Sequence, residues 1–145
     1  MLSDCVFCRI VRGEEWAARV AEDDEHIAFM DIRPMSRGHT LVAPKKHYKD
    51  VFEMSADDVA RLYGFAARVA QAVRRALNPA GLNLLQNNGT AAGQVIFHVH
   101  VHVIPRYSGD EKRFKSGMGR INTSLEELAE IARMIGGEMR GDGFA

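Results

Sequence analysis

Hydrophobic residues recur at helical spacing in two parts of the chain. The first run follows Ser55 and comprises Val59, Leu62, Ala66, Val69, Val73 and Leu77. Ser55 and Asp58 make a start like a capping box, and Asn78-Pro79 stops the run, so we predict one long helix between them. A second run follows Ser124, and we expect the helix that it forms to end at Gly136-Gly137.

Strand patterns lie on both sides of the long helix. Ile27–Asp31, Thr40–Ala43 and Leu82–Gln86 are short apolar runs bounded by turn residues. Val95–Ile104 is the longest strand pattern, because apolar residues occupy every second position there. Strands mixed with one long and one C-terminal helix predict the α+β class, built on an antiparallel sheet.

The two faces of this longest strand differ in chemistry. Successive side chains point to opposite faces of a strand, so the odd-numbered residues from Phe97 to Val103 should face the core. The other face carries His98, His100 and His102. Imidazole is largely neutral, nucleophilic and able to transfer protons near pH 7, so such a row can supply a nucleophile and an acid. A metal site and a set of packed, hydrogen-bonded histidines are the two alternatives.

The charges of the 145-residue chain balance, with 19 Lys and Arg residues against 19 Asp and Glu residues. With no basic excess, we expect no binding to a nucleic-acid backbone or to an anionic membrane. Met1–Ile10 lacks the apolar run of a signal peptide, and no stretch approaches the roughly 18 apolar residues of a membrane span. The two cysteines give no disulfide framework of the secreted kind, so a cytoplasmic location is expected.

The polar stretch Pro105–Asn122 carries several basic residues and no clear helix or strand pattern. A loop of this length is usually functional or mobile. We expect it to be irregular, and two interpretations are open: a solvated surface loop, or an arm that contacts substrate. The tail that ends at Ala145 is expected to fray.

Several sequence blocks accompany the three histidines in a fixed order. They are C5-V-F-C8, F29-M-D31-I-R-P34, G38-H-T-L-V-A-P-K-K-H47, N87-N-G89, A92-G-Q-V95 and H98-V-H-V-H-V103. Together they resemble the histidine triad superfamily over about residues 4–107, and most closely its bacterial Hint-like branch. The resemblance implies one histidine triad domain over residues 1–145, in which a C-terminal loop and helix over 108–137 follow the core.

The resemblance implies that His100 attacks the α-phosphorus of a nucleotide and forms a nucleotidyl-histidine intermediate. The chemistry favours this choice, because a neutral imidazole is not repelled by the anionic oxygens on phosphorus and leaves easily afterwards. In the family, the main-chain carbonyl of the first triad histidine, here His98, accepts a hydrogen bond from the nucleophile. By the same resemblance, His102 helps the leaving group to depart and His39 is an orienting partner.

The resemblance also implies how a purine nucleotide is held. Asp31 would accept hydrogen bonds from the ribose hydroxyls, while Asn87, Gly93 and Gln94 would lie near the phosphate. Four apolar residues would surround the base: Phe7, Ile10, Phe29 and Ile32. Ordinary core packing is an equally good interpretation of these four. Val95 stands where many relatives have a hydroxyl residue, which removes a hydrogen-bond donor near the leaving group.

Cys5 and Cys8 have the spacing of a metal-binding knuckle, although a redox pair and two free thiols are alternatives. The resemblance implies a structural Zn²⁺ ion that these cysteines bind together with His47 and His98. Four protein ligands make a closed tetrahedral site, so this zinc would not be catalytic. No catalytic cofactor is expected.

These observations lead us to expect a purine nucleotide phosphoramidase, or more broadly a nucleotidyl hydrolase, whose partner is a small-molecule purine nucleotide. A dinucleoside polyphosphate hydrolase or phosphorylase is the alternative among enzymes. A nucleotide-binding regulatory protein with little activity is the alternative outside them. The resemblance also implies a homodimer, for which the face of Val59–Leu77 is available unless it is buried within the monomer.

Overall fold

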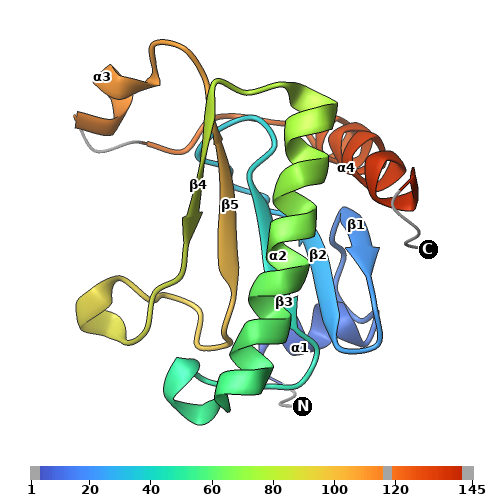
Figure 1. The fold of residues 1–145 in the computed structure, drawn as a ribbon, viewed down its shortest axis with the longest axis vertical. Helices are drawn as coiled ribbons and strands as arrows, with labels where there is room; N and C mark the ends of the chain where they lie inside the picture. The colour runs from blue at the N-terminus through green and yellow to red at the C-terminus, as the bar shows by residue number, and fades with distance from the viewer. Residues whose placement is uncertain (1–3, 116–118, 142–145) are drawn as a thin grey trace.

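The structure is a computed structural model that describes residues 4–115 and 119–141 (Figure 1). Five strands form an antiparallel sheet in the order β1-β2-β3-β5-β4. The strands are β1 (Arg19–Glu22), β2 (His26–Met30), β3 (Thr40–Pro44), β4 (Gly81–Leu85) and β5 (Val101–Arg106). The sheet confirms the predicted α+β class, and the first three predicted strands lie within one residue of their expected bounds.

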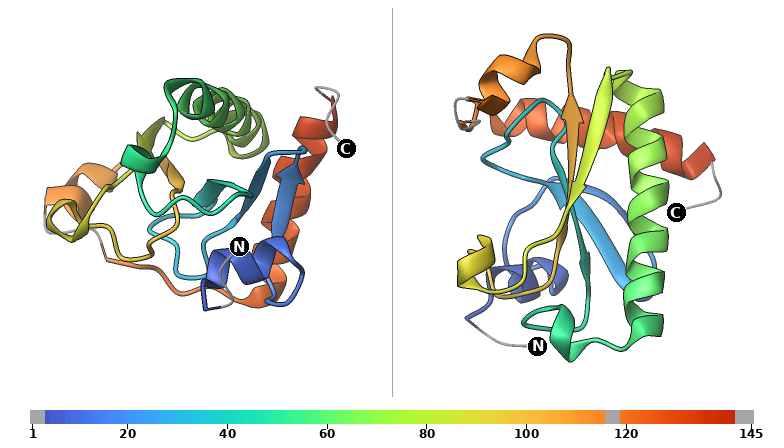
Figure 2. Two further views of the ribbon diagram at one scale, coloured as in Figure 1. Left: turned by 90° about the horizontal axis from the view of Figure 1, so that it is seen from below. Right: turned by 60° about the vertical axis from the view of Figure 1, so that its left-hand side comes forward.

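Helices cover both faces of this sheet. α2 (Ala56–Leu77) and α4 (Leu125–Gly141) pack on one face and contact each other, while α1 (Val6–Val11) lies on the opposite face (Figures 1 and 2). Within β2, Met30 belongs to the core under α2 and α4, whereas Phe29 belongs to the core under α1. Both faces of the central strands are therefore buried, and a polar side chain on them must find its partner within the protein.

The long helix α2 begins and ends as predicted. The Oγ atom of Ser55 accepts a hydrogen bond from the main-chain N–H of Asp58 at 3.0 Å, which satisfies a free donor of the first turn. Asn78 ends the helix in a left-handed conformation with φ of 49°. Leu62 and Val69 are buried in the core. The apolar face of α2 thus packs within the monomer and is not available for pairing with a second copy.

The strand prediction over Val95–Ile104 is wrong in its first half, because β5 starts only at Val101. The residues before it are irregular, and their polar side chains bind groups outside the sheet. The ring of His98 lies in a cluster of cysteine and histidine side chains, and the amide of Gln94 donates to a main-chain carbonyl of this segment at 3.1 Å. As a result Phe97, which the alternation assigns to the core, is 38% exposed.

The prediction that Gly136-Gly137 ends the second helix is also wrong, since α4 continues to Gly141. A Cβ atom at Gly136 would lie 2.6 Å from the carbonyl oxygen of Val20 in β1. This glycine therefore allows the helix to approach the sheet closely. The tail predicted to fray, residues 142–145, lies outside the described residues. No helix in the described part of the chain has both the length and the apolar surface needed to cross a membrane.

The stretch Pro105–Asn122 is more regular than expected, because it contains the end of β5 and the short helix α3 (Asp110–Lys115). The carboxylate of Asp110 accepts a hydrogen bond from the main-chain N–H of Tyr107 at 2.8 Å and pairs with Arg106 at 3.4 Å. These contacts fold the chain back after β5. The sequence prediction lacks the helices α1 and α3, the strand β1 and two short 3-10 helices, η1 (Val51–Glu53) and η2 (Thr90–Ala92).

Candidate active site and metal centre

His100 lies just before β5, and the main chain fixes the position of its ring proton. Its Nδ1–H donates a hydrogen bond to the carbonyl oxygen of His98 at 2.7 Å. Because Nδ1 carries the proton, Nε2 of the neutral ring keeps its lone pair. Burial lowers the pKa of His100, so this neutral form dominates near pH 7. The ring therefore has the protonation state that a nucleophile requires.

A second pair of histidines lies beside His100 and also has a defined proton order. The main-chain N–H of Met35 donates to Nδ1 of His39 at 3.0 Å, so the proton of this buried ring is on Nε2. Nε2–H of His39 then donates to Nδ1 of His102 at 2.9 Å, which leaves the proton of His102 on its Nε2 atom. Burial lowers the pKa of both rings to about 3, so both are neutral.

The rings of His100 and His102 are in contact, with their centroids 4.9 Å apart. His100 has a free lone pair on its Nε2 atom, whereas His102 has an N–H group on its Nε2 atom. A nucleophile next to a hydrogen-bond donor suits a substitution reaction in which the donor stabilises the negative charge that develops on the leaving group. The two rings thus carry their protons on different nitrogen atoms although they come from one short segment.

Asp31 follows β2 and lies next to the His39–His102 pair. Its Oδ2 atom is 3.6 Å from Nε2 of His39 and 3.2 Å from Nη1 of Arg120. Its Oδ1 atom accepts a hydrogen bond from the main-chain N–H of Arg33 at 2.8 Å. A carboxylate has about four lone-pair sites, so each oxygen keeps a free site. These two free acceptor sites match the two hydroxyl groups of a ribose.

The stretch Pro105–Asn122 lies against this site. Its donors bind the main-chain carbonyls of residues 33–35 at distances between 2.6 and 2.8 Å, from the side chains of Arg113 and Arg120 and the N–H of Ile121. Met35, in the segment that carries these carbonyls, also supplies the N–H group that orients the His39–His102 pair. These contacts favour the interpretation of the stretch as an arm at the site over that of a solvated surface loop.

The side chain of Gln94 is buried, and its hydrogen bonds hold the loop before the triad in place. Its amide oxygen accepts from the N–H of Gly89 at 2.7 Å, and its amide nitrogen donates to two main-chain carbonyls at 2.7 and 3.1 Å. These contacts support a structural role for Gln94 rather than contact with phosphate. Gly93 has φ of 92°, and a Cβ atom there would lie 3.6 Å from Nδ2 of Asn87. Asn87 and Gly93, the other two of the three residues expected near the phosphate, are therefore neighbours.

The four residues expected around the base divide into two groups. Phe7, Ile10 and Phe29 are buried in one core cluster, where the rings of Phe7 and Phe29 meet edge-on with centroids 5.2 Å apart. Phe7 also packs edge-on against His100 at 4.9 Å, so this core supports the His100 ring. Ile32 is 60% exposed. Core packing explains the first three, and Ile32 alone of the four presents an exposed apolar surface.

Cys5, Cys8, His47 and His98 form a compact cluster between α1 and the segment before β5. The Sγ atoms of Cys5 and Cys8 lie 3.5 and 3.7 Å from Nδ1 of His98. Sγ of Cys8 and Nδ1 of His98 lie 3.4 and 3.1 Å from Nδ1 of His47. A tetrahedral zinc ion with Zn–N near 2.0 Å and Zn–S near 2.3 Å requires separations of about 3.3–3.8 Å between its ligands. The cluster fits one such ion.

The positions of the ring protons distinguish the Cys/His cluster from a second group of side chains with donor atoms of the kind that bind metals. Nε2–H of His98 donates to the carbonyl of Pro44 at 2.8 Å, so Nδ1 offers its lone pair to the cluster. Donor atoms of Asp31, His39 and His102 also lie within 4.8 Å of one another. Nδ1 of His39, however, already accepts a hydrogen bond, so a metal on Nε2 would leave that ring without any proton. We interpret this second group as a hydrogen-bonded chain.

Comparison with known proteins agrees with the triad geometry. The sequence profile of the HIT domain matches residues 12–109. The chain belongs to the HIT family. Among HIT relatives, the adenylylsulfatase HINT3 of Arabidopsis thaliana is 44% identical over 127 residues, which are 88% of this chain and 64% of HINT3.

Two solved HIT structures share the whole fold. A hypothetical histidine triad nucleotide-binding protein from Sulfolobus tokodaii superposes with a TM-score of 0.85 at 38% identity, over 94% of this chain and 93% of that chain. A zinc-bound histidine triad family protein from Mycobacterium smegmatis superposes with a TM-score of 0.82 at 37% identity, over 96% and 97% of the two chains. The similarity thus extends over nearly the full length of each protein.

Several groups at this HIT site have no signal in the sequence. The N–H of Met35 and the carbonyl of Pro44 determine the proton positions of two histidines. Any residue except proline can supply a main-chain N–H, and any residue can supply a carbonyl, so residue type gives no indication. Arg120 is visible only as one of several basic residues in its stretch, and only the fold brings it to Asp31.

Proposed function

We propose that the protein is a nucleotidyl hydrolase that cleaves purine nucleotide conjugates at the α-phosphorus, with His100 as the nucleophile. The observation that carries this proposal is the 2.7 Å hydrogen bond from Nδ1–H of His100 to the carbonyl of His98. It leaves a neutral ring with its lone pair on Nε2, which is the species able to attack an anionic phosphate ester. The relative HINT3, named an adenylylsulfatase, supports hydrolysis at this coarse level.

In the first step Nε2 of His100 bonds to phosphorus while the bond to the leaving group breaks. The ring becomes positively charged, and the carbonyl of His98 stabilises this charge through the Nδ1–H hydrogen bond. Nε2–H of His102 donates a hydrogen bond to the leaving atom. In the second step water attacks the adduct, the P–N bond breaks, and its electron pair returns to Nε2 of His100. The proton lost by water passes to the solvent or to the departed group.

The protonation of His102 bears on the choice of leaving group. Because burial holds the pKa of His102 at about 3, the neutral ring stabilises charge but has no acidic proton to give. A leaving group that departs as a stable anion, such as sulfate or phosphate, needs no proton. An amine must take one from water. Nucleoside phosphoramidates are the first substrate class that we propose, and this feature supports adenylyl sulfate or dinucleoside polyphosphates as the second.

Purified protein should be tested with an adenosine phosphoramidate, adenylyl sulfate and a dinucleoside polyphosphate, with and without added inorganic phosphate. We expect hydrolysis of at least one, and a stimulation by phosphate would indicate a phosphorylase. The His100→Ala variant should bind AMP but not turn over any of these compounds. Binding of AMP without turnover by the wild type would instead support a regulatory protein.

We also propose that Cys5, Cys8, His47 and His98 hold one structural Zn²⁺ ion. The donor set and the separations described above support this, as does the zinc-bound relative from Mycobacterium smegmatis. Zinc supplies a rigid crosslink here, which ties α1 to the segment that carries the triad. No step of the hydrolysis involves it.

A homodimer is a further part of the proposal. β4 is an edge strand of the sheet, and its Leu84 and Leu85 are 44% and 42% exposed. An exposed apolar edge strand offers free main-chain groups and apolar side chains to a second sheet. We therefore propose pairing through β4. Sedimentation should give a dimer for the wild type and a monomer for Leu85→Asp.

A further inference from the structure

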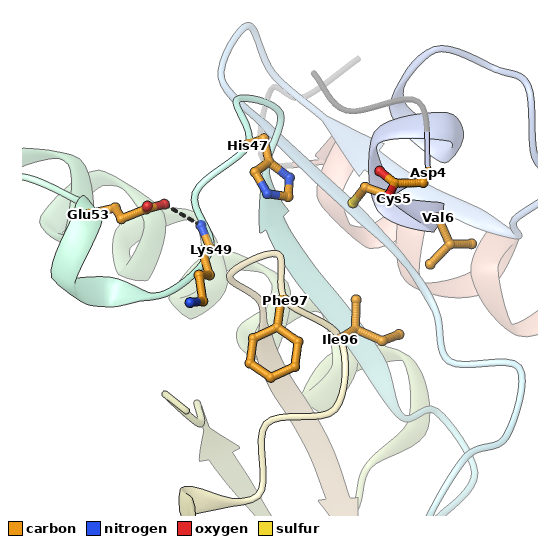
Figure 3. Close-up of a pocket in the computed structure, with 8 residues that line it drawn as sticks. All are labelled: Asp4, Cys5, Val6, His47, Lys49, Glu53, Ile96 and Phe97. Carbon is orange, nitrogen blue, oxygen red and sulfur yellow. Dashed lines mark hydrogen bonds between the residues drawn. The ribbon is translucent and has the colours of Figure 1, made fainter. Parts of the chain in front are cut away.

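The Cys/His cluster borders a pocket that the hydrolase mechanism does not use. The pocket has a volume of about 590 Å³, and its lining includes Cys5, Val6 and His47 but not His100 (Figure 3). Cys5 is partly exposed, whereas Cys8 is completely buried. One thiol of the cluster is thus open to small solutes, and the other can be reached only through its neighbours.

Cys5 and Cys8 are close enough to react with each other. Cys5 is the N-cap residue of α1, Cys8 lies in its first turn, and the main-chain N–H of Cys8 donates to Sγ of Cys5 at 3.4 Å. The two Sγ atoms lie within 4.8 Å of each other. Rotation of the side chains can close this separation to the length of a disulfide bond, about 2.05 Å. The pair can therefore bind a metal when reduced and form a disulfide when oxidised.

His98 connects this pair to the nucleophile. Its Nδ1 atom lies in the cluster 3.5 Å from Sγ of Cys5, while its carbonyl oxygen accepts the hydrogen bond from His100. The same residue is thus held by the cluster through its side chain and orients the nucleophile through its main chain. Without the cluster, the segment before β5 keeps the bonds from His98 to Pro44 and from Gln94 to Ile96. The N–H of Val99 lies in the same planar peptide group as the carbonyl of His98 and donates to the carbonyl of Tyr48, the residue that follows His47 of the cluster. Loss of the cluster therefore removes side-chain contacts at both ends of the hydrogen bond that fixes the carbonyl of His98.

We propose that Cys5 and Cys8 form a peroxide-sensitive pair whose oxidation releases the metal and lowers the activity of His100. The proposal rests on the zinc site and the hydrolase function proposed above. The thiolate of Cys5 attacks one oxygen of hydrogen peroxide and the O–O bond breaks, which gives a sulfenic acid and hydroxide. The thiolate of Cys8 then attacks the sulfenic sulfur, the S–S bond forms, and a second hydroxide leaves.

Each hydroxide takes a proton from the buffer, so two thiolates, one hydrogen peroxide and two protons give one disulfide and two water molecules. Two electrons pass from sulfur to oxygen. The metal loses both thiolate ligands and keeps only two imidazoles, which are too few for a stable structural site. It then dissociates through the pocket beside Cys5.

The test uses reduced, full-length protein loaded with one equivalent of Zn²⁺ and treated with hydrogen peroxide. A chromogenic chelator measures released zinc, thiol titration and intact mass report the disulfide, and turnover is followed in parallel. We expect zinc release in step with the loss of both thiols, and a fall in kcat of about tenfold or more, since small misplacements of a catalytic group have effects of this size. Dithiothreitol with added Zn²⁺ should restore both zinc content and turnover.

Two variants separate the parts of this proposal. His100→Ala should release zinc at the wild-type rate, so a failure of the hydrolase proposal leaves the redox reaction measurable. Val6→Phe enlarges a side chain that lines the pocket beside Cys5 and should slow the release severalfold.

Zinc that stays bound at a peroxide concentration that oxidises glutathione would overturn the redox site. Disulfide formation and zinc loss with unchanged turnover would overturn the link to His100. An unchanged release rate in Val6→Phe would overturn the pocket as the route.

Discussion

The neutral state of buried His39 makes folding stability depend on pH in a way that one substitution can isolate. In the unfolded chain a histidine has a pKa of about 6.5, whereas burial lowers the pKa of His39 in the folded protein to about 3. Between these values the unfolded state binds a proton that the folded state does not. The folded pKa is the lower one, so this stability is fully present above pH 6.5 and is lost as the pH falls toward 3.

The size of the effect follows from proton linkage. One group of this kind loses about 1.4 kcal/mol of unfolding free energy for each pH unit below 6.5. Lowering the pH from 7 to 5 therefore removes about 2 kcal/mol through His39 alone. Burial also lowers the pKa of His98 and of His102, so the total change does not identify the contribution of His39. The His39→Gln variant removes the His39 titration, and the amide N–H of glutamine can still donate to His102, so the difference between the two proteins reports mainly the contribution of His39.

Urea unfolding at pH 7, 6 and 5 measures this difference. At pH 7 we expect His39→Gln to be less stable by about 1–3 kcal/mol, because the N–H of Met35 loses its acceptor. The gap should narrow by about 2 kcal/mol at pH 5, because only the wild type is destabilised by the titration of His39. A gap that is the same at all three pH values would refute the assignment of a buried neutral ring with a low pKa.

Three further predictions test other parts of the structure. Gly136→Ala should lower the unfolding free energy by about 1–3 kcal/mol, because its Cβ would meet the carbonyl of Val20, whereas Gly137→Ala should be neutral or stabilising; equal melting temperatures would contradict this. Arg120→Gln should reduce the preference for ribose over 2′-deoxyribose substrates by about threefold or more, because the Asp31 carboxylate loses an ion pair that contributes up to ~1 kcal/mol. An equal fall in kcat/KM for both kinds of substrate would contradict this prediction. A strong zinc chelator should lower the melting temperature of wild-type protein, and an unchanged value would argue against a structural metal.

The sequence predicted most of the sheet and the long helix because those segments satisfy local rules. Ser55 and Asn78 act as cap and stop for α2 through groups that lie within four residues of them. The apolar runs of β2 and β3 remain strands because both faces of each are covered. Local pattern and tertiary packing agree in these segments.

The errors arise where a tertiary contact decides the local structure. Gly136 permits close packing on β1 instead of ending α4, which no local rule shows. The alternation from Val95 onward predicts a strand, but the side chain of His98 joins a cluster whose other members are more than fifty residues away in the sequence. The pairing of β5 with β3 consequently reaches only to Val101.

The site itself was predictable as a set of residue types but not as an arrangement of protons. The histidines and Asp31 were expected together by family resemblance, and the structure brings His39, His102 and Asp31 into contact. Which nitrogen carries each proton depends on main-chain groups such as the carbonyl of His98. Those groups are positioned by the fold.

A single-turnover experiment tests the central claim most directly. Excess protein is mixed with an adenylyl conjugate that is radioactive at the α-phosphorus and is quenched in alkali, where a phosphorus–nitrogen bond survives. We expect labelled protein to appear before labelled AMP, with the label on a peptide that contains His100 and none on His100→Ala. Release of AMP at the full rate with no labelled protein at any time, or a label on another residue, would contradict attack by this imidazole.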